Sequence, residues 1–242
     1  MASLPSRSKV PLPKTPRITA ILPVRLLPSA KKRLEGLLDD SARHRLVLAM
    51  LNDALTAATE ARAIQHVMIV TNDEKLKAPR RSQRVETFIT NSGSLNGDLA
   101  AAIEHARNQG ADAVLIVLPD LPLLTAKTLD ALIQEGRGET AVVIAKDWRG
   151  TGTNALYLRP PAALHPQFGS NSFDAHLAQA KRAGLNPVSF VANETALDLD
   201  DAEALTRFQQ VATGLPKACT TNTYRALSKL LNLKNEHSFL PA

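Results

Sequence analysis

The sequence predicts one α/β domain with a mostly parallel central sheet and helices on both faces. Strand-length apolar runs alternate along the chain with segments whose apolar residues recur at helical spacing. Parallel strands need crossover connections, and helices in those connections cover both faces of the sheet. The run "VLIVL" at 114–118 is apolar throughout, as expected for a strand buried on both faces. The 242 residues, 44% of them hydrophobic, are enough for one large domain and its core.

The individual elements follow from the apolar pattern and from capping and stop signals. Ser41 and Thr125 are candidate N-caps of helices, and Gly136 and Gly184 are candidate stops. Strands are expected at 18–24, 66–72, 112–120, 140–147, 154–160 and 187–192. Helices are expected at 41–62, 96–109, 125–135, 172–183 and 201–211. The domain organisation that we expect is a flexible basic arm at 1–17, a single domain at 18–213, and a tail at 214–242 with a short helix near 224–231.

The composition restricts the partners and the compartment. The net charge of +6 and the pI of about 9.6 favour an anionic partner, but an aromatic content of 4% argues against stacking platforms for single-stranded nucleic acid. No apolar run reaches the length of a membrane span, and the N-terminal arm lacks the apolar core of a secretory signal. The single cysteine, Cys219, excludes an intrachain disulfide framework. We expect a cytoplasmic protein that binds small anionic molecules, with no nucleic acid and no membrane as partner.

A carboxylate at a strand end is the first candidate site residue. Asp120 ends the apolar strand, and Pro119 and Pro122 stiffen the backbone around it. In open α/β sheets, ligands bind outside the carboxyl ends of the strands, which is where this side chain is expected. A turn acid, or a residue that starts the next helix, is the alternative that the strand context leaves open.

A second acidic cluster lies in "LDLDD" at 197–201. Asp198 and Asp200 are two residues apart, so in an extended chain they point to the same side, where their charges repel unless a cation intervenes. Together with Asp120 they would form a three-carboxylate oxygen site of the kind that suits Mg²⁺. Asp200 is also a candidate N-cap of the following helix, and the two roles are compatible.

Two loops with glycines are candidate ligand sites. In "RGTGTNAL" at 149–156, glycines allow a ligand close to the backbone, and a hairpin loop between two strands is the alternative. The candidate residues of this loop are Thr151, Gly152, Thr153 and Asn154. In "FGSNSF" at 168–173, Gly169 gives a turn, and Ser172 is a candidate cap of a helix whose N-terminus would bind phosphate or carboxylate.

Basic residues follow the first strand in "LPVRLLPSAKKRL" at 22–34. Its cations could neutralise a triphosphate, or they could form a solvated basic loop. The cations in question are Arg25, Lys31, Lys32 and Arg33. Further along, "SGSLNGDL" places Asn96 at the start of a helix, where it could read a base edge or cap the helix.

The motifs taken together resemble a known family. In sequence order, "LPV…AKKRL", "SLNGDL", "PDLPLL", "GTGTNALYLRPP", "FGSNSFDAHL" and "LDLD" are similar to segments of the guanylyltransferases of coenzyme F-420 biosynthesis, the CofC or FbiD type, also called 2-phospho-L-lactate guanylyltransferases. The resemblance covers about residues 18–210. It implies a nucleotide-diphospho-sugar transferase (GT-A) like fold, GTP as co-substrate and Mg²⁺ as cofactor. The implied reaction joins GMP to 2-phospho-L-lactate, phosphoenolpyruvate or 3-phospho-D-glycerate and releases pyrophosphate.

The resemblance also implies roles for individual residues. It makes Asp120, Lys31 and Arg33 catalytic, with Asp120, Asp198 and Asp200 as metal ligands. It places the phosphorylated acid at Thr151, Gly152, Thr153, Asn154, Gly169 and Ser172. It places the nucleotide at Leu22, Pro23, Val24, Arg25, Leu95, Asn96 and Pro119. A homodimer and a hand-over of the product to the next pathway enzyme are further expectations.

Two other classes of function stay open at this point. One is a related nucleotidyltransferase that acts on another phosphorylated metabolite; it should show a Gly-rich "GGxGxR"-type first loop, where this chain has "VRLLPSAKKRL". The other is a non-catalytic nucleic-acid-binding protein that uses its basic surface, whose affinity would fall steeply with salt.

Overall fold

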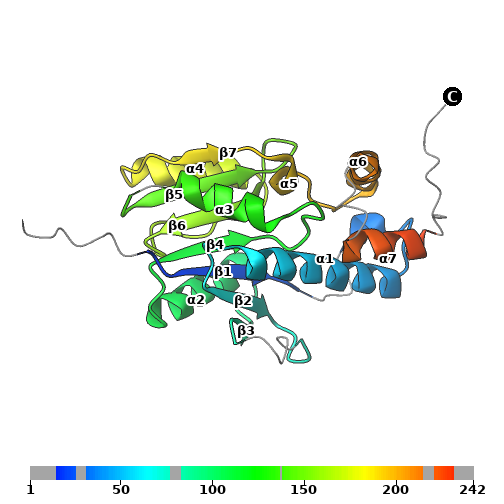
Figure 1. Ribbon diagram of the computed structural model, residues 1–242, viewed down its shortest axis with the longest axis horizontal. Coiled ribbons are helices and arrows are strands. Elements are labelled where there is room, and N and C mark those ends of the chain that lie inside the picture. Colours follow the sequence, from blue (N-terminus) through cyan, green and yellow to red (C-terminus); the bar gives the residue numbers. More distant parts are fainter. Residues whose placement is uncertain (1–14, 26–30, 77–82, 137, 215–220, 232–242) are drawn as a thin grey trace, which may run out of the picture.

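The computed structural model describes residues 15–25, 31–76, 83–136, 138–214 and 221–231. Most of the basic arm expected at 1–17 lies outside the described residues, as does Cys219. Within the described ranges, seven strands form one sheet in the order β3-β2-β1-β4-β6-β5-β7 (Figure 1). The strands are β1 (Ile18–Pro23), β2 (His66–Thr71), β3 (Val85–Ile89), β4 (Ala113–Val117), β5 (Ala141–Lys146), β6 (Thr153–Arg159) and β7 (Val188–Phe190).

The sheet is mostly parallel, as predicted. β1 pairs in parallel with β2 and β4, β2 with β3, and β5 with β7, whereas β6 runs antiparallel to both of its neighbours. The short connection from β5 to β6 confirms the hairpin reading of the loop around 147–152. β1 and β4 are adjacent and parallel, with Ile21 opposite Ile116, so the segments that follow both strands leave the sheet at the same edge.

Helices cover both faces of the sheet, because each carries an apolar stripe that packs on the strands. One core cluster contains Leu46 of α1, Leu129 of α3 and Phe208 of α6, and the other contains Leu99 of α2 and Phe173 of α4. The helices are α1 (Asp40–Glu60), α2 (Leu95–Asn108), α3 (Ala126–Glu135), α4 (Ser172–Arg182), α5 (Asn193–Ala196), α6 (Ala202–Thr213) and α7 (Asn222–Leu230), with a 3₁₀ turn η1 (Lys32–Leu34).

The edge strand β3 is an element that the sequence analysis missed. In "VETFI" only Val85 is buried, while the other residues are half-buried or exposed. A strand at the edge of a sheet needs no continuous apolar run, so the pattern that marked the central strands is absent here.

Three predicted helix caps are wrong by one or two residues. The N-caps of α1, α4 and α6 are Asp39, Asn171 and Asp201 rather than the predicted Ser41, Ser172 and Asp200. Asp39 and Asp201 each accept a hydrogen bond from the backbone N–H three residues further on. Thr125 is confirmed as the cap of α3. Several good capping residues stand side by side in these segments, and only the backbone path decides which of them caps.

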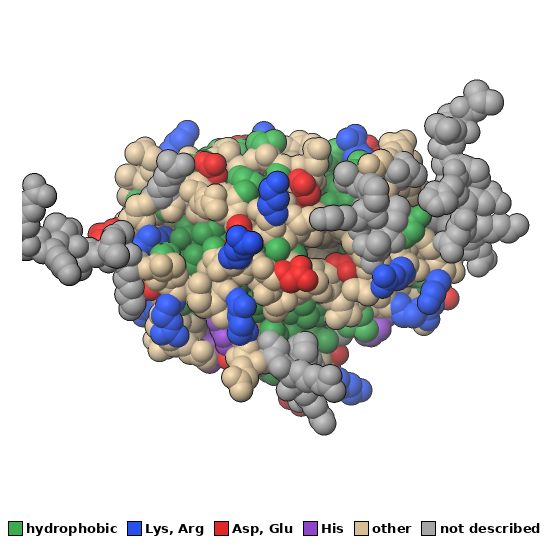
Figure 2. Space-filling view, in the orientation of Figure 1, with side chains coloured by type: hydrophobic (Ala, Val, Ile, Leu, Met, Phe, Trp, Pro, Cys, Tyr) green, Lys and Arg blue, Asp and Glu red, His purple; other side chains and the backbone are tan. Residues whose placement is uncertain are grey.

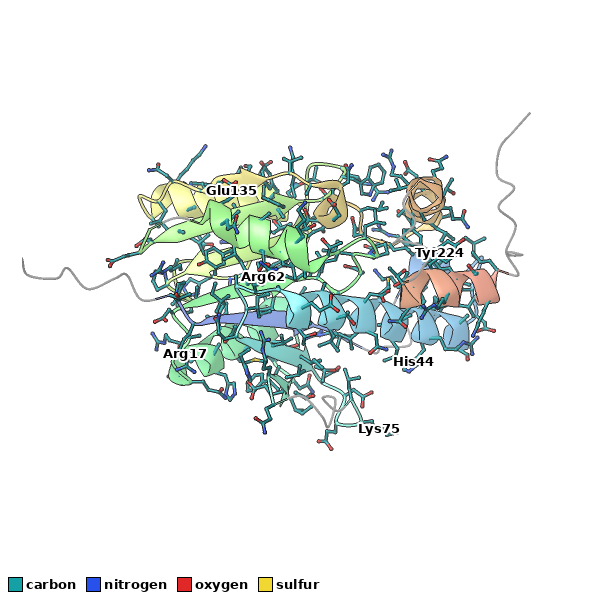
Figure 3. All side chains as sticks on the ribbon, viewed as in Figure 1. Arg17, His44, Arg62, Lys75, Glu135 and Tyr224 are labelled. Atoms are coloured by element: carbon teal, nitrogen blue, oxygen red, sulfur yellow. The ribbon has the colours of Figure 1, made fainter. Side chains whose placement is uncertain are left out.

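The short helix predicted near 224–231 is confirmed as α7, and it packs along α1 (Figure 3). Asp53 of α1 accepts hydrogen bonds from the backbone N–H groups of Asn222 and Thr223, each at 2.8 Å, and so caps α7 from outside. Leu227 is buried, and Tyr224, labelled in Figure 3, packs against the core beside it. The residues after 231 lie outside the described part of the chain.

Two surface properties bear on the partners. Among the described residues, no helix is both long and apolar enough to cross a membrane. On the face shown in Figure 2, Lys and Arg side chains are interspersed with Asp and Glu rather than gathered into one basic patch. An electrostatic footprint for nucleic acid would be a continuous basic stripe, which this face does not show.

Candidate active site

Side chains from three distant segments meet at the edge of the sheet where β1 and β4 end. The ammonium group of Lys31 donates to Asp120 Oδ2 at 2.6 Å and also to Asp200 Oδ1. Lys31 precedes η1, Asp120 follows β4, and Asp200 directly precedes the cap of α6. The structure thus brings together three of the residues that the sequence singled out, across sequence separations of 89 and 169 residues.

Backbone contacts hold the segment that carries Asp198 and Asp200 against the loop after β4. The N–H of Leu199 donates to the carbonyl oxygen of Asp120 at 3.0 Å. Leu197 and Leu199 are buried in the core, and the aspartates alternate with them in this extended segment. The two-residue spacing therefore turns both carboxylates to the same side, as the sequence analysis expected.

Asn154 lies in this supporting structure rather than in an open loop. It is buried in β6, and its Nδ2 donates to the carbonyl oxygens of Thr195 and Ala196 at 3.0 and 2.9 Å. Its own carbonyl accepts from the N–H of Leu118, just before Asp120. Asn154 thus connects the two segments that carry the acidic residues.

The electrostatics of the acidic cluster are those of a site that attracts a cation. Burial, reinforced by the carboxylates of Asp120 and Asp200, raises the pKa of Asp198 to about 6. Burial alone would lower the pKa of Lys31, but the same two carboxylates outweigh it and raise that pKa above its ordinary value. Lys31 is therefore charged and compensates part of the negative charge.

The donor set is suited to a hard divalent cation. Among the described residues, Asp120 Oδ1 and Asp198 Oδ1 are buried oxygens without a hydrogen-bond partner. Such atoms are costly unless a cation or a proton satisfies them. Within the same residues, no three acidic, histidine or cysteine side chains converge closely enough to hold a metal ion as they stand, and the Lys31 ammonium binds two of the acids. All-oxygen ligands fit Mg²⁺, which keeps waters and substrate phosphates in its remaining positions.

The loop between β5 and β6 is ordered by its own carboxylate. Asp147 Oδ1 accepts from the N–H groups of Thr151 and Gly152 at 2.8 and 2.9 Å. A Cβ atom at position 152 would lie 2.9 Å from Asp147 Oδ2, so this close approach favours glycine there. Thr151 is exposed and its carbonyl oxygen accepts from the N–H of Phe173, which joins this loop to the start of α4.

Thr153 and Ser172 meet beneath this loop, together with a histidine that the sequence analysis missed. The N–H of Thr153 donates to Ser172 Oγ at 2.8 Å, which explains why Ser172 does not cap α4. Thr153 Oγ1 lies 3.0 Å from Nδ1 of the fully buried His176, whose Nε2 accepts from the N–H of Gln167 at 2.9 Å. Nε2 is thus unprotonated, so Nδ1 carries the proton and Thr153 Oγ1 accepts it. Burial lowers the pKa of His176 to about 4, so the ring is neutral.

The expected nucleotide residues divide into a buried backbone run and a polar cluster. Leu22, Pro23 and Val24 are buried, and the N–H of Val24 donates to the carbonyl oxygen of Val70, while Pro119 and Leu95 are half-buried. Arg25 pairs with Asp98 of α2, which also accepts from the N–H and hydroxyl of Ser92, both at 2.8 Å. Burial would raise the pKa of Asp98, but these hydrogen bonds hold it below its ordinary value.

Arg33 and Asn96 are the remaining two expected site residues. Arg33 is exposed in η1, next to the acidic cluster. The pKa of Asp201 is lowered mainly by the hydrogen bond from the N–H of Ala204, and the charge of Arg33 adds to this effect. Asn96 does not cap α2, because Ser94 does. Its side-chain amide instead bonds the backbone of Phe168, at the start of the loop that leads into α4.

The mostly parallel α/β sheet, with acids at the carboxyl edge of β1 and β4, has the fold of the nucleotide-diphospho-sugar transferase type. Solved structures agree on the fold. A protein described as a nucleotide-diphospho-sugar transferase from Desulfovibrio desulfuricans G20 superposes with a TM-score of 0.72 at 15% identity, covering 89% of this chain and 96% of that one. A nucleotidyl transferase from Methanothermobacter gives 0.59 at 16% identity, covering 81% and 97%.

The family model for CofC-like guanylyl transferases matches residues 18–214, and the chain belongs to that family. It is 37% identical to a phosphoenolpyruvate guanylyltransferase from Sphaerobacter thermophilus, over 75% of this chain and 87% of the relative. It is 34% identical to one from Chloroflexus aggregans, over 77% and 94%. The protein is therefore an enzyme, a guanylyltransferase of the type that serves coenzyme F-420 biosynthesis, and neither alternative class of function is favoured.

Proposed function

We propose that this enzyme transfers GMP from GTP to phosphoenolpyruvate with release of pyrophosphate, in a Mg²⁺-dependent reaction. A phosphate oxygen of the acceptor attacks the α-phosphorus of GTP, and the bond from that phosphorus to the β-phosphate oxygen breaks. The acceptor phosphate is already anionic near neutral pH, so the chain needs no strong general base. Catalysis then consists of positioning and of charge neutralisation.

The acidic cluster with Lys31 is the observation that carries this proposal. An ammonium group and three carboxylates at the end of β4 form a charged site suited to polyphosphate and a divalent cation. The choice of phosphoenolpyruvate over the two other acids rests on the relatives, since those from Sphaerobacter, Chloroflexus and Rubrobacter all carry the name phosphoenolpyruvate guanylyltransferase.

In this proposal Asp120, Asp198 and Asp200 hold the metal ion. Mg²⁺, when bound, screens the anionic phosphates and stabilises the charge that develops in the displacement. Lys31 is tied to two of these acids in the described structure. Once the acids have another cationic partner, its ammonium group is available to the leaving pyrophosphate, together with the exposed guanidinium of Arg33.

The acceptor would lie at the loop between β5 and β6 and at the start of α4. Gly169 is exposed with a φ of 134°, and Ser172 begins α4, whose positive N-terminal end would attract a phosphate or carboxylate. The N–H groups of Ser172 and Phe173 already donate to the carbonyl oxygens of Gly169 and Thr151. Thr153 and Ser172 are buried and bond each other, so they would form the floor of this site. Thr151 and Gly152 form its rim.

A pyrophosphate-release assay tests the proposal. The protein is given GTP and Mg²⁺ with phosphoenolpyruvate, 2-phospho-L-lactate or 3-phospho-D-glycerate in separate reactions, coupled to the next pathway enzyme. We expect turnover with phosphoenolpyruvate, a guanylylated product by mass spectrometry, and no turnover when ATP replaces GTP. Turnover with another acid only would refute the acceptor, and no release with any of them would refute the activity.

The expectations of a cytoplasmic location, a homodimer and a hand-over of the product stay predictions. Light scattering of the purified chain would measure its mass in solution. A coupled assay in which a trapping reagent competes with the next enzyme would show whether the product is released before it is used.

A further inference from the structure

One side chain joins the two regions to which the proposed function assigns the nucleotide and the acceptor. Nδ2 of Asn96 donates to the carbonyl oxygen of Phe168 at 3.0 Å, and the N–H of Phe168 donates to Asn96 Oδ1 at 2.8 Å. Asn96 lies in the first turn of α2, and Phe168 lies 72 residues away, immediately before Gly169. The side-chain amide of Asn96 thus satisfies both the N–H and the carbonyl group of Phe168, as a neighbouring strand would.

Each of the two regions is held internally by its own contacts. On the nucleotide side, Asp98 binds Arg25 and Ser92, which fixes the loop after β1 to the start of α2. On the acceptor side, the ring of His176 accepts a hydrogen bond from the N–H of Gln167 and contacts Thr153. Among the described residues, Leu99 and Phe168 share one core cluster, but the hydrogen bonds of the two networks are joined only by the Asn96 amide.

We propose that Asn96 is a positioning residue that couples the two substrate sites, so that bound GTP strengthens the binding of the acceptor and the reverse. This inference rests on the proposed function. Two hydrogen bonds to the backbone of one residue require a fixed distance and orientation between α2 and the 168–172 loop. A ligand that orders either region therefore orders the other, and the second ligand binds to a site whose ordering is already complete. By linkage the strengthening is equal in both directions.

A binding cycle measures this coupling directly. Calorimetry with Mg²⁺ would give the affinity for a GTP analogue with a methylene group between the α- and β-phosphates, the affinity for phosphoenolpyruvate, and each affinity again with the other ligand present. We expect the wild type to bind each ligand about fivefold or more tightly when the other is bound, at the lower end of common coupling factors.

Two variants and a matched control separate coupling from a merely structural role. Asn96→Asp keeps an acceptor for the Phe168 N–H but removes the donor to its carbonyl oxygen, and Asn96→Ala removes both. Asn108→Ala changes the same residue type at the exposed last position of α2. We expect a coupling factor near one in both Asn96 variants and a wild-type factor in Asn108→Ala.

The outcomes are distinguishable. Unchanged coupling in the folded Asn96 variants, or equal weakening of all four affinities, would overturn the positioning role while leaving the proposed function in place. A wild type that binds both ligands without coupling would do the same. A wild type that binds neither GTP analogue nor acceptor would overturn the proposed function, and this inference with it.

Discussion

The buried imidazole of His176 predicts that the fold loses stability in mild acid. Burial lowers its pKa from the ordinary 6.5 to about 4. Between these values the unfolded chain binds a proton at this residue and the folded chain does not. The stability that the neutral His176 ring contributes to the fold is therefore fully present above pH 6.5 and is lost as the pH falls toward 4. At 1.36 kcal/mol per pH unit, the loss should reach about 3 kcal/mol by pH 4, a large part of the 5–15 kcal/mol, roughly, that stabilises a typical domain.

Urea unfolding at several pH values tests this, with His176→Gln as the comparison. Glutamine is uncharged at every pH, and its amide oxygen can still accept from the N–H of Gln167. The variant should be less stable than the wild type at pH 7, because the contact with Thr153 is lost. The difference between the two proteins should then shrink by about 3 kcal/mol between pH 6.5 and 4.

Other titrating groups also change stability with pH, but their contributions cancel in this comparison. Asp98 and Asp201 have lowered pKa values, so the stability that they contribute is lost only as the pH falls below the unfolded value of 3.8. Asp198 acts oppositely, because its raised pKa lets the folded chain bind a proton first, and stability rises as the pH falls from about 6. All three are present in both proteins. Parallel stability curves from pH 6.5 to 4 would refute the assignment of a buried, neutral histidine.

Two further substitutions test other contacts. Lys31→Met removes the cation between two acids, so unfolding with a chelator present should become easier by about 2–3 kcal/mol, less than for a fully buried pair because Asp200 is 41% exposed. Added Mg²⁺ should restore that loss, and equal stability with and without Mg²⁺ would contradict the metal site. Asp53→Ala removes the external cap of α7 and should cost about 1–2 kcal/mol in unfolding, with turnover unchanged. Asn52→Ala, at the exposed neighbouring position, should cost nothing measurable; a drop in turnover for Asp53→Ala alone would show that α7 supports the site.

The sequence was sufficient for the six other strands of the sheet, though not for the edge strand β3, and for the meeting of the acids. Apolar strands mark their own ends, and the carboxyl ends of parallel neighbours meet at one edge, so Asp120 could be placed before any coordinates. The spacing of Asp198 and Asp200 likewise fixed their common direction. Both predictions rest on the order of residues within a single segment of the chain.

Contacts between distant segments were not predictable in the same way. His176 belongs to the buried stripe of α4, four residues after Ser172, and only the fold brings its ring to Thr153. Asp53 caps a helix 169 residues further along, which no local pattern in α1 indicates. Asn96 was assigned to a base edge or to a cap, because its bond to Phe168 exists only in three dimensions.

The most direct test of the account is the turnover of Asp120→Asn with GTP, phosphoenolpyruvate and Mg²⁺. Asparagine keeps the size of the side chain but removes the charge that binds Lys31 and would bind the metal ion. Asp112→Asn, at an exposed position just before the opposite end of β4, is the matched control. We predict that Asp120→Asn, folded as judged by its urea transition, loses turnover by about a thousandfold or more, while the control keeps wild-type turnover. Turnover near that of the wild type in Asp120→Asn would contradict the proposed site.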